Sequence, residues 1–202
     1  MAMSQKENIP GYTPIFLMLL LESQFPAFGK NLHLIDQLSN GFKLYRSGEP
    51  SEADLREYER LGIKELAVLS GDANSYEKKN MAMVPGLTVV YDQKQDADVP
   101  VTMSFLKWFD QWVEDARSKG KAIAFRCQCG CHRTGRLAAY YQMKYQNLTM
   151  DDAWVLLDEY GKNMWLHGNL KKQITSLKDY IDGRPCSQEP KHCVIDDRGN
   201  QK

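Results

Sequence analysis

The chain has 202 residues, of which 43% are hydrophobic, and it carries 26 basic and 26 acidic side chains. This length is ample for one domain with a buried core and marginal for two. The balanced charge excludes a general electrostatic attraction to nucleic acid or to an anionic membrane surface. Any anion that the protein binds must be held by a specific site, and we expect no nucleic-acid partner. The sequence does not indicate an oligomeric state.

The N-terminal thirty residues contain one apolar run, residues 15–21. Seven apolar residues are too few to span a bilayer, which requires about 20 in a helix. The run is also at the lower length limit for a signal-peptide core, Glu7 precedes it, and no small-x-small cleavage site follows. We expect residues 1–30 to form an N-terminal arm or helix of a cytoplasmic protein, with a weak export signal and a periplasmic location as the alternative.

Capping signals and apolar runs then alternate along the chain. Ser51 at an N-cap position, with Asp54 three residues later, begins a helix that Gly62 ends. Apolar stripes of helical period predict further helices, and short continuous apolar runs predict strands. The predicted helices cover residues 51–61, 102–118 and 133–146, a segment that begins at the Thr149 cap, and residues 170–181. The predicted strands cover residues 66–69, 87–91 and 122–125.

This alternation predicts one α/β domain over residues 31–182, with a mainly parallel central sheet flanked by helices on both faces. Ligands of such sheets bind at the carboxyl ends of the strands. Residues 183–202 are rich in Pro, Gly and charge, so we expect them to form a loose polar tail. Cys186 and Cys193 in this tail can pair with each other if the protein meets an oxidising compartment.

The loop FRCQCGCHRTG, residues 125–135, joins the last predicted strand to the helix after it. A short loop in this place directs backbone N–H groups and the positive end of a helix dipole at one point, which makes an anion site. The same field lowers the pKa of a thiol, so we expect Cys127 to be a nucleophilic thiolate. Arg133 adds a planar fork for two phosphate oxygens, Thr134 adds a hydroxyl, and Gly130 lets the loop curl.

The pattern C-x-x-G-x-x-R-T-G, from Cys127 to Gly135, resembles the phosphate-loop signature of the cysteine-dependent protein tyrosine phosphatases. Its HRTG ending is similar to that of the plant and fungal atypical dual-specificity branch. Residues 44–50 (LYRSGEP) and 145–147 (YQN) are similar to segments of bacterial members of that branch. The resemblance covers about residues 31–165 and implies a phosphatase-like domain there.

The resemblance implies that Cys127 attacks phosphorus to give a phosphocysteine, and that Thr134 assists release of the thiolate. The implied phosphate-binding loop consists of Gln128, Cys129, Gly130, Cys131, His132 and Arg133. No metal or cofactor takes part in this mechanism. The substrate is then a phosphorylated protein or a phosphorylated small molecule.

A general acid must protonate the leaving oxygen. In the family that this chain resembles, the acid is an aspartate on the loop after the preceding strand, some thirty residues before the cysteine. Asp92 ends a predicted strand and lies 35 residues before Cys127, whereas Asp96 and Asp98 lie 31 and 29 residues before it. The position at a strand end favours Asp92 as the acid, and the spacing keeps Asp96 and Asp98 as alternatives.

Two departures from the family pattern bear on activity and substrate. Arg126 stands before the cysteine where the family usually has His, which leaves a cation beside the thiolate. Gln128, Cys129 and Cys131 occupy loop positions where members that act on highly phosphorylated inositols tend to carry Lys or Arg. We therefore rank a phosphoprotein or a small phosphomonoester above the alternatives, which are an inositol polyphosphate or pyrophosphate and a phosphoinositide.

Other interpretations of the cysteines remain open. Cys129 or Cys131 can resolve an oxidised Cys127 as a disulfide. A zinc site is also conceivable, but it leaves the Arg-Thr-Gly ending of the loop unexplained. Its ligands would come from Cys127, Cys129, Cys131 and His132, with Cys186 and either His192 or Cys193 as a second pair. A third interpretation is a phosphate-binding module without turnover.

Overall fold

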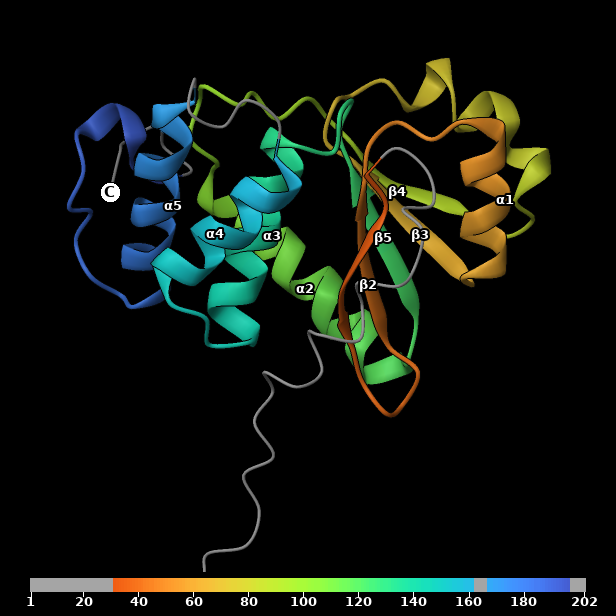
Figure 1. Cartoon of the computed structure of the whole chain (residues 1–202), viewed down its shortest axis with the longest axis horizontal. Helices are drawn as coiled ribbons and strands as arrows, with labels where there is room; N and C mark the ends of the chain where they lie inside the picture. Colours follow the sequence, from red (N-terminus) through yellow and green to blue (C-terminus); the bar gives the residue numbers. More distant parts are fainter. Residues whose placement is uncertain (1–30, 162–166, 197–202) are drawn as a thin grey trace, which may run out of the picture.

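Five strands form a central sheet in the computed structural model of the protein, which describes residues 31–161 and 167–196 (Figure 1). The strands are β1 (His33–Gln37), β2 (Lys43–Ser47), β3 (Ile63–Val68), β4 (Thr88–Asp92) and β5 (Ala122–Arg126). Their order is β1-β2-β5-β3-β4, with β1 antiparallel to β2 and all other neighbours parallel. The predicted α/β fold with a mainly parallel sheet is confirmed. The predicted N-terminal arm, residues 1–30, lies outside the described residues.

The strands β1 and β2 were not predicted from the sequence. β2 reads KLYRS, and both Arg46 and Ser47 are buried in it. A charged residue in so short a run hides the apolar pattern of a buried strand. The partners that compensate for the burial of its charge come from distant parts of the chain, so the sequence near β2 does not reveal them. Pairing with β5, in which Arg46 lies opposite Phe125, places the end of β2 beside the loop that follows β5.

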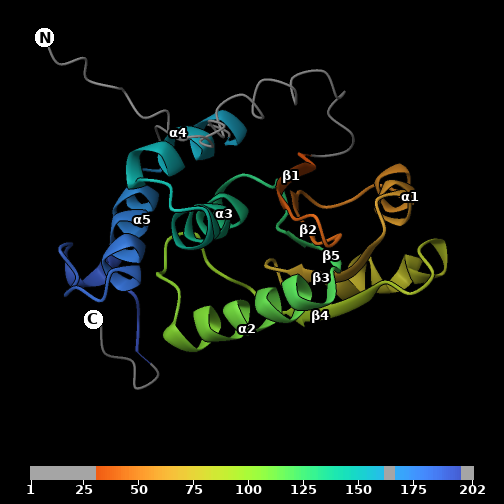
Figure 2. The same cartoon turned by 90° about the horizontal axis from the view of Figure 1, so that it is seen from below.

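Helices cover both faces of the sheet (Figure 2). The α-helices are α1 (Glu52–Arg60), α2 (Met103–Lys119), α3 (His132–Tyr145), α4 (Met150–Tyr160) and α5 (Gly168–Ile181). The 3₁₀ helices η3 (Ala73–Ser75) and η4 (Lys78–Met83) follow β3, and η6 (Pro190–His192) follows α5. α1 lies on one face, whereas α3, α4 and α5 lie on the other. The five helices predicted from the sequence are confirmed.

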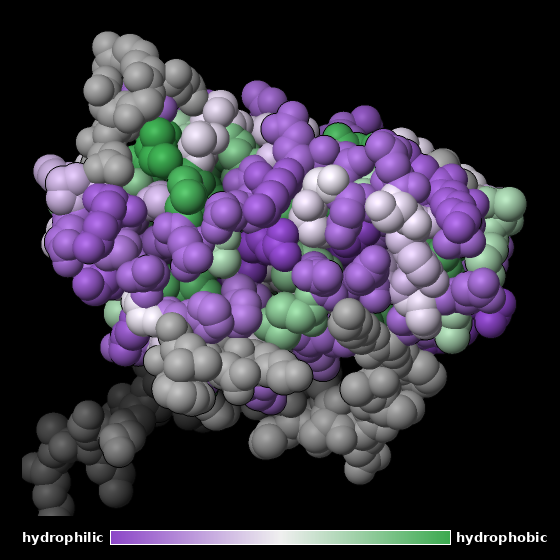
Figure 3. Space-filling view, turned by 90° about the horizontal axis from the view of Figure 1, so that it is seen from above, coloured by the Kyte–Doolittle hydropathy of each residue, from purple (hydrophilic) through white to green (hydrophobic). Residues whose placement is uncertain are grey.

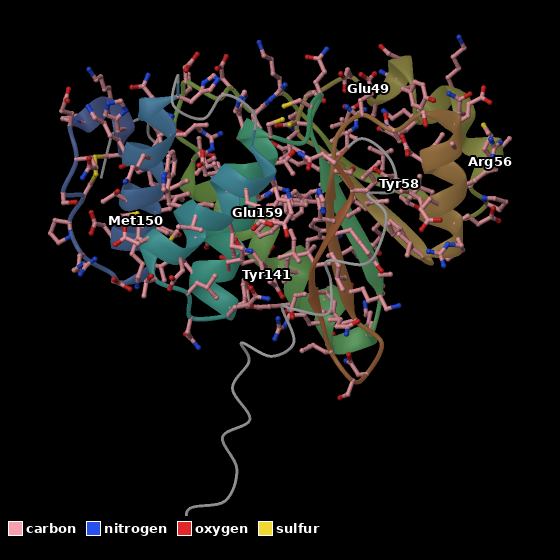
Figure 4. The ribbon with its side chains drawn as sticks, in the orientation of Figure 1. Glu49, Arg56, Tyr58, Tyr141, Met150 and Glu159 are labelled. Carbon is pink, nitrogen blue, oxygen red and sulfur yellow. A yellow bond between two sulfur atoms is a disulfide. The ribbon has the colours of Figure 1, made fainter. Side chains whose placement is uncertain are left out.

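Caps and core side chains explain where these helices lie. Ser51 and Asp54 form a reciprocal capping box at the start of α1, and the Thr102 hydroxyl accepts a hydrogen bond from the Phe105 N–H in the first turn of α2. Tyr58, labelled in Figure 4, points from α1 toward the sheet. It is fully buried, and its hydroxyl oxygen lies 2.5 Å from Oγ of Ser47.

A buried ion pair joins β5 to the segment that follows β3. The Arg126 guanidinium donates to both carboxylate oxygens of Glu77, each at 2.5 Å, and both side chains are inaccessible to solvent. It also donates to Asp72 and Ser70 at 2.7 Å. The cation that the sequence places directly before Cys127 is therefore paired, because two carboxylates compensate its charge.

The C-terminal segment packs on the domain as far as residue 196. Cys186 and Cys193 form a disulfide, and Cys193 and Val194 are buried. Backbone hydrogen bonds join Ile195 to Val101 and Met103 at the start of α2. The expectation of a loose tail is wrong for residues 183–196, because the contacts that fix this polar segment are made with residues far away in the sequence.

The face at the carboxyl ends of the parallel strands is mostly hydrophilic where it can be seen, and its apolar residues form separate small patches (Figure 3). No helix in residues 31–161 and 167–196 is long and apolar enough to cross a membrane.

Glu77→Ala should destabilise the fold strongly. The substitution leaves the Arg126 guanidinium buried without its two-oxygen partner, and breaking such a pair costs about 3–5 kcal/mol. Urea unfolding measures the loss. Glu189→Ala, which removes exposed ion pairs with Lys172 and Lys191, is the matched control and should leave the midpoint nearly unchanged. Equal losses in the two variants would contradict this role of Glu77.

Candidate active site

The loop from Cys127 to Cys131 lies between β5 and α3, at the carboxyl end of the central strand. Cys127 forms its floor and is 1% exposed. Gly130 has φ +73°, and a Cβ atom there would lie 2.6 Å from the Gly48 backbone nitrogen. The loop therefore needs glycine at this position both for its backbone conformation and for its close approach to the end of β2.

Donors outside the loop hold its carbonyl groups. Gly130 O accepts hydrogen bonds from Nδ2 of Asn31 at 2.9 Å and from Nη2 of Arg46 at 2.7 Å. Gln128 O accepts one from the Glu49 N–H at 3.0 Å. These bonds tie the outer side of the loop to β2 and to the residues that flank it, which fixes the backbone conformation that an anion site requires.

Asn31 also connects the loop to α4. Its Nδ2 donates to Tyr160 O at 2.9 Å, and its Oδ1 lies 2.8 Å from Nε2 of His33. The His33 and Tyr160 rings are in contact, with centroids 4.3 Å apart. The first described residues of the chain therefore support the phosphate loop from behind.

Gly135, Arg133 and Thr134 follow in the first turn of α3. A Cβ atom on Gly135 would lie 2.9 Å from Cγ of Leu157, so the glycine lets α3 pack closely against α4. Nη1 of Arg133 is 3.4 Å from Leu69 O, just beyond the end of β3, and the side chain is half-buried. Thr134 is fully buried beside Cys127. The structure therefore brings together the predicted nucleophile, arginine and hydroxyl.

Opposing contacts act on the Cys127 thiol. The hydrogen bond with the Cys129 side chain, together with burial, raises the pKa of Cys127 to about 12, while the Thr134 hydroxyl and N–H act to lower it. The predicted lowering of the Cys127 pKa is therefore wrong, because burial and the second thiol outweigh the groups that favour the thiolate. Cys129 is itself held in the loop, because its Sγ accepts a hydrogen bond from the Cys131 N–H at 3.1 Å.

The three candidate acids have different surroundings. The Asp92 carboxylate accepts from the Ala73 N–H and from the Lys78 ammonium, each at 3.1 Å. Asp96 and Asp98 lie further along the loop, where the Asp98 N–H donates to the Asp96 carboxylate at 3.0 Å.

The charge around Asp96 links it to the phosphate loop. The hydrogen bond from Asp98, followed by the charges of Lys94, Arg133 and Arg136, lowers the pKa of the Asp96 carboxyl. The charge of Asp96 therefore interacts with that of Arg133 in the phosphate loop.

Two buried side chains that the sequence analysis missed hold the segment with Asp96. Arg136 donates to Asp96 O at 2.9 Å and to Val99 O at 2.7 Å, and Gln173 donates to Ala97 O at 3.0 Å. Arg136 directly follows Gly135, the last residue of the motif. This position was the only local signal for its role. Gln173 lies on α5 and shows no signal in the sequence.

His167 is a third residue that the sequence analysis missed. Its ring centroid lies 3.8 Å from that of His132 in the loop. Burial and the neighbouring His132 lower the pKa of His167, while Asp98 opposes them. Two imidazoles therefore lie together at the start of α3 and α5.

The zinc interpretation lacks its second pair of ligands, because Cys186 and Cys193 are joined in a disulfide. Within residues 31–161 and 167–196, no three His, Cys, Asp or Glu side chains are arranged to hold a metal ion.

Comparison with known families decides the identity. The family model of the dual specificity phosphatase catalytic domain matches residues 48–179. They include the phosphate loop, residues 96–99, which we call the acid segment because they carry Asp96 and Asp98, all of α1 to α4 and most of α5. The chain belongs to this family. It is a cysteine-dependent phosphatase of the protein tyrosine and dual-specificity type and acts on phosphorylated substrates.

Solved structures show the same fold at low sequence identity. TpbA from P. aeruginosa is 19% identical, covers 79% of this chain and 99% of its own, and has a TM-score of 0.53. The core catalytic domain of the PP-IP phosphatase SIW14 from S. cerevisiae is 19% identical over 77% and 90% of the two chains, with a TM-score of 0.60. PTPMT1 is 14% identical over 75% and 96%, with a TM-score of 0.56. A comparison with curated proteins finds no match.

Cys129→Ala should make the Cys127 thiol of this phosphatase more acidic, because it removes the neighbour that contributes most to its raised pKa. We expect iodoacetamide to alkylate Cys127 about tenfold faster at a fixed pH below that pKa. Mass spectrometry of the tryptic peptide that begins at Cys127 measures the rate. Cys131→Ala is the control, and the same acceleration in both variants would contradict a specific effect of Cys129.

Proposed function

We propose that Cys127 is the nucleophile of a phosphomonoester hydrolase that works through a phosphocysteine. The thiolate forms a bond to phosphorus while the bond to the leaving oxygen breaks, and the general acid gives that oxygen a proton. Water then attacks phosphorus, the sulfur–phosphorus bond breaks, and inorganic phosphate leaves. The observation that carries this proposal is the buried cysteine at the floor of a loop whose carbonyl groups are held from outside.

The other groups of the loop have separate roles in this proposal. Arg133 and the amides of residues 128–133 bind the oxygens that carry the developing charge. Thr134, buried beside the thiol, stabilises the departing thiolate during hydrolysis. These steps are complete without a metal ion or a cofactor.

Cys127→Ser and Arg133→Ala should abolish the hydrolysis of an aryl phosphate, and a chelator should leave wild-type activity unchanged. The first variant lacks the nucleophile and the second lacks the fork that binds the phosphate. Release of inorganic phosphate measures the activity. Arg60→Ala, on the exposed face of α1, is the control and should remain active. Persistent turnover in either site variant would contradict the mechanism.

We favour Asp96 as the general acid over Asp92, which the sequence analysis preferred. Asp92 is held by the Ala73 N–H and by Lys78. Asp96 has the Asp98 N–H and the exposed Lys94 as partners, but it belongs to a segment that Arg136 holds, and its charge interacts with that of Arg133. A bound phosphate dianion brings negative charge toward Asp96 and raises the pKa of its carboxyl, which favours the protonated form that an acid needs. Asp98 is the remaining alternative.

Asp96→Asn should lower kcat by about 10²-fold or more for substrates with poor leaving groups, and by less for aryl phosphates whose leaving group needs no proton. Asp92→Asn and Asp98→Asn are the matched variants. Steady-state kinetics across a leaving-group series separates the three. A leaving-group-dependent loss confined to Asp92→Asn would return the role to that residue.

The uncharged side chains of the loop support a substrate with a single phosphate. Gln128, Cys129 and Cys131 add no positive charge to the amides and Arg133. TpbA has been solved with pTyr and PTPMT1 with PI(5)P, so the fold does not separate these substrate classes. We propose a phosphoprotein or a small phosphomonoester, with inositol pyrophosphates and phosphoinositides as alternatives. A higher kcat/KM for an inositol pyrophosphate than for a phosphotyrosine peptide would reverse this order.

The disulfide between Cys186 and Cys193 favours an exported, periplasmic protein over the cytoplasmic location, because disulfides persist in oxidising compartments. Alkylation of intact cells before lysis, followed by mass spectrometry, tests this proposal. Both tail thiols alkylated in the cell would support the cytoplasmic location.

A further inference from the structure

Arg46 lies directly behind the phosphate loop. It is 3% exposed, and its position on β2 pairs with Phe125 on β5, two residues before the catalytic cysteine. Its Nη2 donates to Gly130 O at 2.7 Å and to Cys131 O at 3.4 Å. The guanidinium therefore contacts the outer side of the loop whose inner side faces phosphate.

The charge of Arg46 lacks a carboxylate partner in residues 31–161 and 167–196. Its contacts there are carbonyl groups and the Tyr160 ring, whose centroid is 5.4 Å from Cζ. Its Nε is buried and has no hydrogen-bond partner in the same residues. Burial lowers the pKa of Arg46 to about 10, and the ionisable groups that oppose this effect are Tyr160 and the three loop thiols, with Cys127 contributing most.

The other buried arginines differ in this respect. Arg126 is paired with Glu77 and Asp72, and Arg136 lies near the carboxylates of the acid segment. A buried charge without a counter-ion is strongly unfavourable. An anion in the loop would offset this cost, and the candidates are the Cys127 thiolate, whose charge interacts with that of Arg46, and the phosphate of a substrate.

We propose that Arg46 is a positioning residue of the phosphate site, which holds the loop carbonyls outward and stabilises both the Cys127 thiolate and the bound phosphate through its uncompensated charge. The proposal rests on the proposed role of Cys127 as the nucleophile.

The remaining groups around Cys127 are divided between two effects. Burial and Cys129 favour the neutral thiol, whereas Thr134 favours the thiolate. His33 on β1 faces Arg46, but burial and the Arg46 charge lower the pKa of His33 to about 4, so it is neutral at neutral pH. Arg46 is therefore the cation that β2 contributes from behind the loop.

The test measures the reactivity of Cys127 directly. In a Cys129→Ala/Cys131→Ala background, Cys127 is the remaining loop thiol, and its alkylation by iodoacetamide is followed over a pH series with and without inorganic phosphate. Arg46→Met should slow alkylation at least about tenfold at each pH below the thiol pKa. It should also weaken the protection by phosphate, whereas Arg46→Lys, which keeps the charge, should retain most of the rate.

The matched control is Asn31→Ala, which removes the other donor to Gly130 O without changing the charge. It should slow alkylation much less than Arg46→Met does. An unchanged pH dependence in folded Arg46→Met, or equal effects of the two variants, would overturn the proposal. If Arg46→Met does not fold, Arg46→Gln answers the same question, because it removes the charge and keeps an N–H donor. If the wild-type protein has no phosphatase activity, the proposed function is contradicted but the role of Arg46 is not. Alkylation of Cys127 and its protection by phosphate do not depend on turnover.

Discussion

Buried guanidinium groups hold the loops at the carboxyl ends of the strands, and the active site depends on this interaction. Backbone carbonyl groups leave the sheet ladder there and need new donors, and an arginine brings five in a fixed plane. Arg46 binds the phosphate loop, Arg136 binds the acid segment, and Arg126 binds the carboxylates that follow β3. Each is at most 3% exposed, so solvent does not compete for these donors.

This arrangement explains how a chain without net charge can bind phosphate. In the mechanism that we propose, the affinity comes from oriented amides, from Arg133 and from the charge of Arg46 behind the loop, rather than from a basic surface. The same burial acts against the nucleophile, because a thiol enclosed beside Cys129 resists ionisation. The balance between these effects determines how much thiolate the enzyme holds at neutral pH.

Features that depend on local sequence were predictable. The Ser51 and Thr149 caps, the apolar runs of β3 to β5 and the motif from Cys127 to Gly135 each signal their structure within a few residues. Features that depend on distant partners were not. β2 contains a buried arginine whose partners lie about 84 positions away, and residues 183–196 are fixed by a disulfide and by backbone contacts with the start of α2. The acid segment is held by Arg136 on α3 and Gln173 on α5, which the sequence does not place near it. The position of Asp92 at the end of a strand was therefore the only local signal, and it favoured Asp92 as the general acid.

A crystal structure of the protein with orthovanadate tests the central claim most directly, because vanadate occupies the place of the transferred phosphoryl group. The account predicts vanadium bound to Sγ of Cys127, the Arg133 fork on two oxygens, and Gly130 O still bonded to Asn31 and Arg46 with the loop unmoved. Vanadate bound elsewhere, or a loop that rearranges and breaks both of those hydrogen bonds, would contradict it.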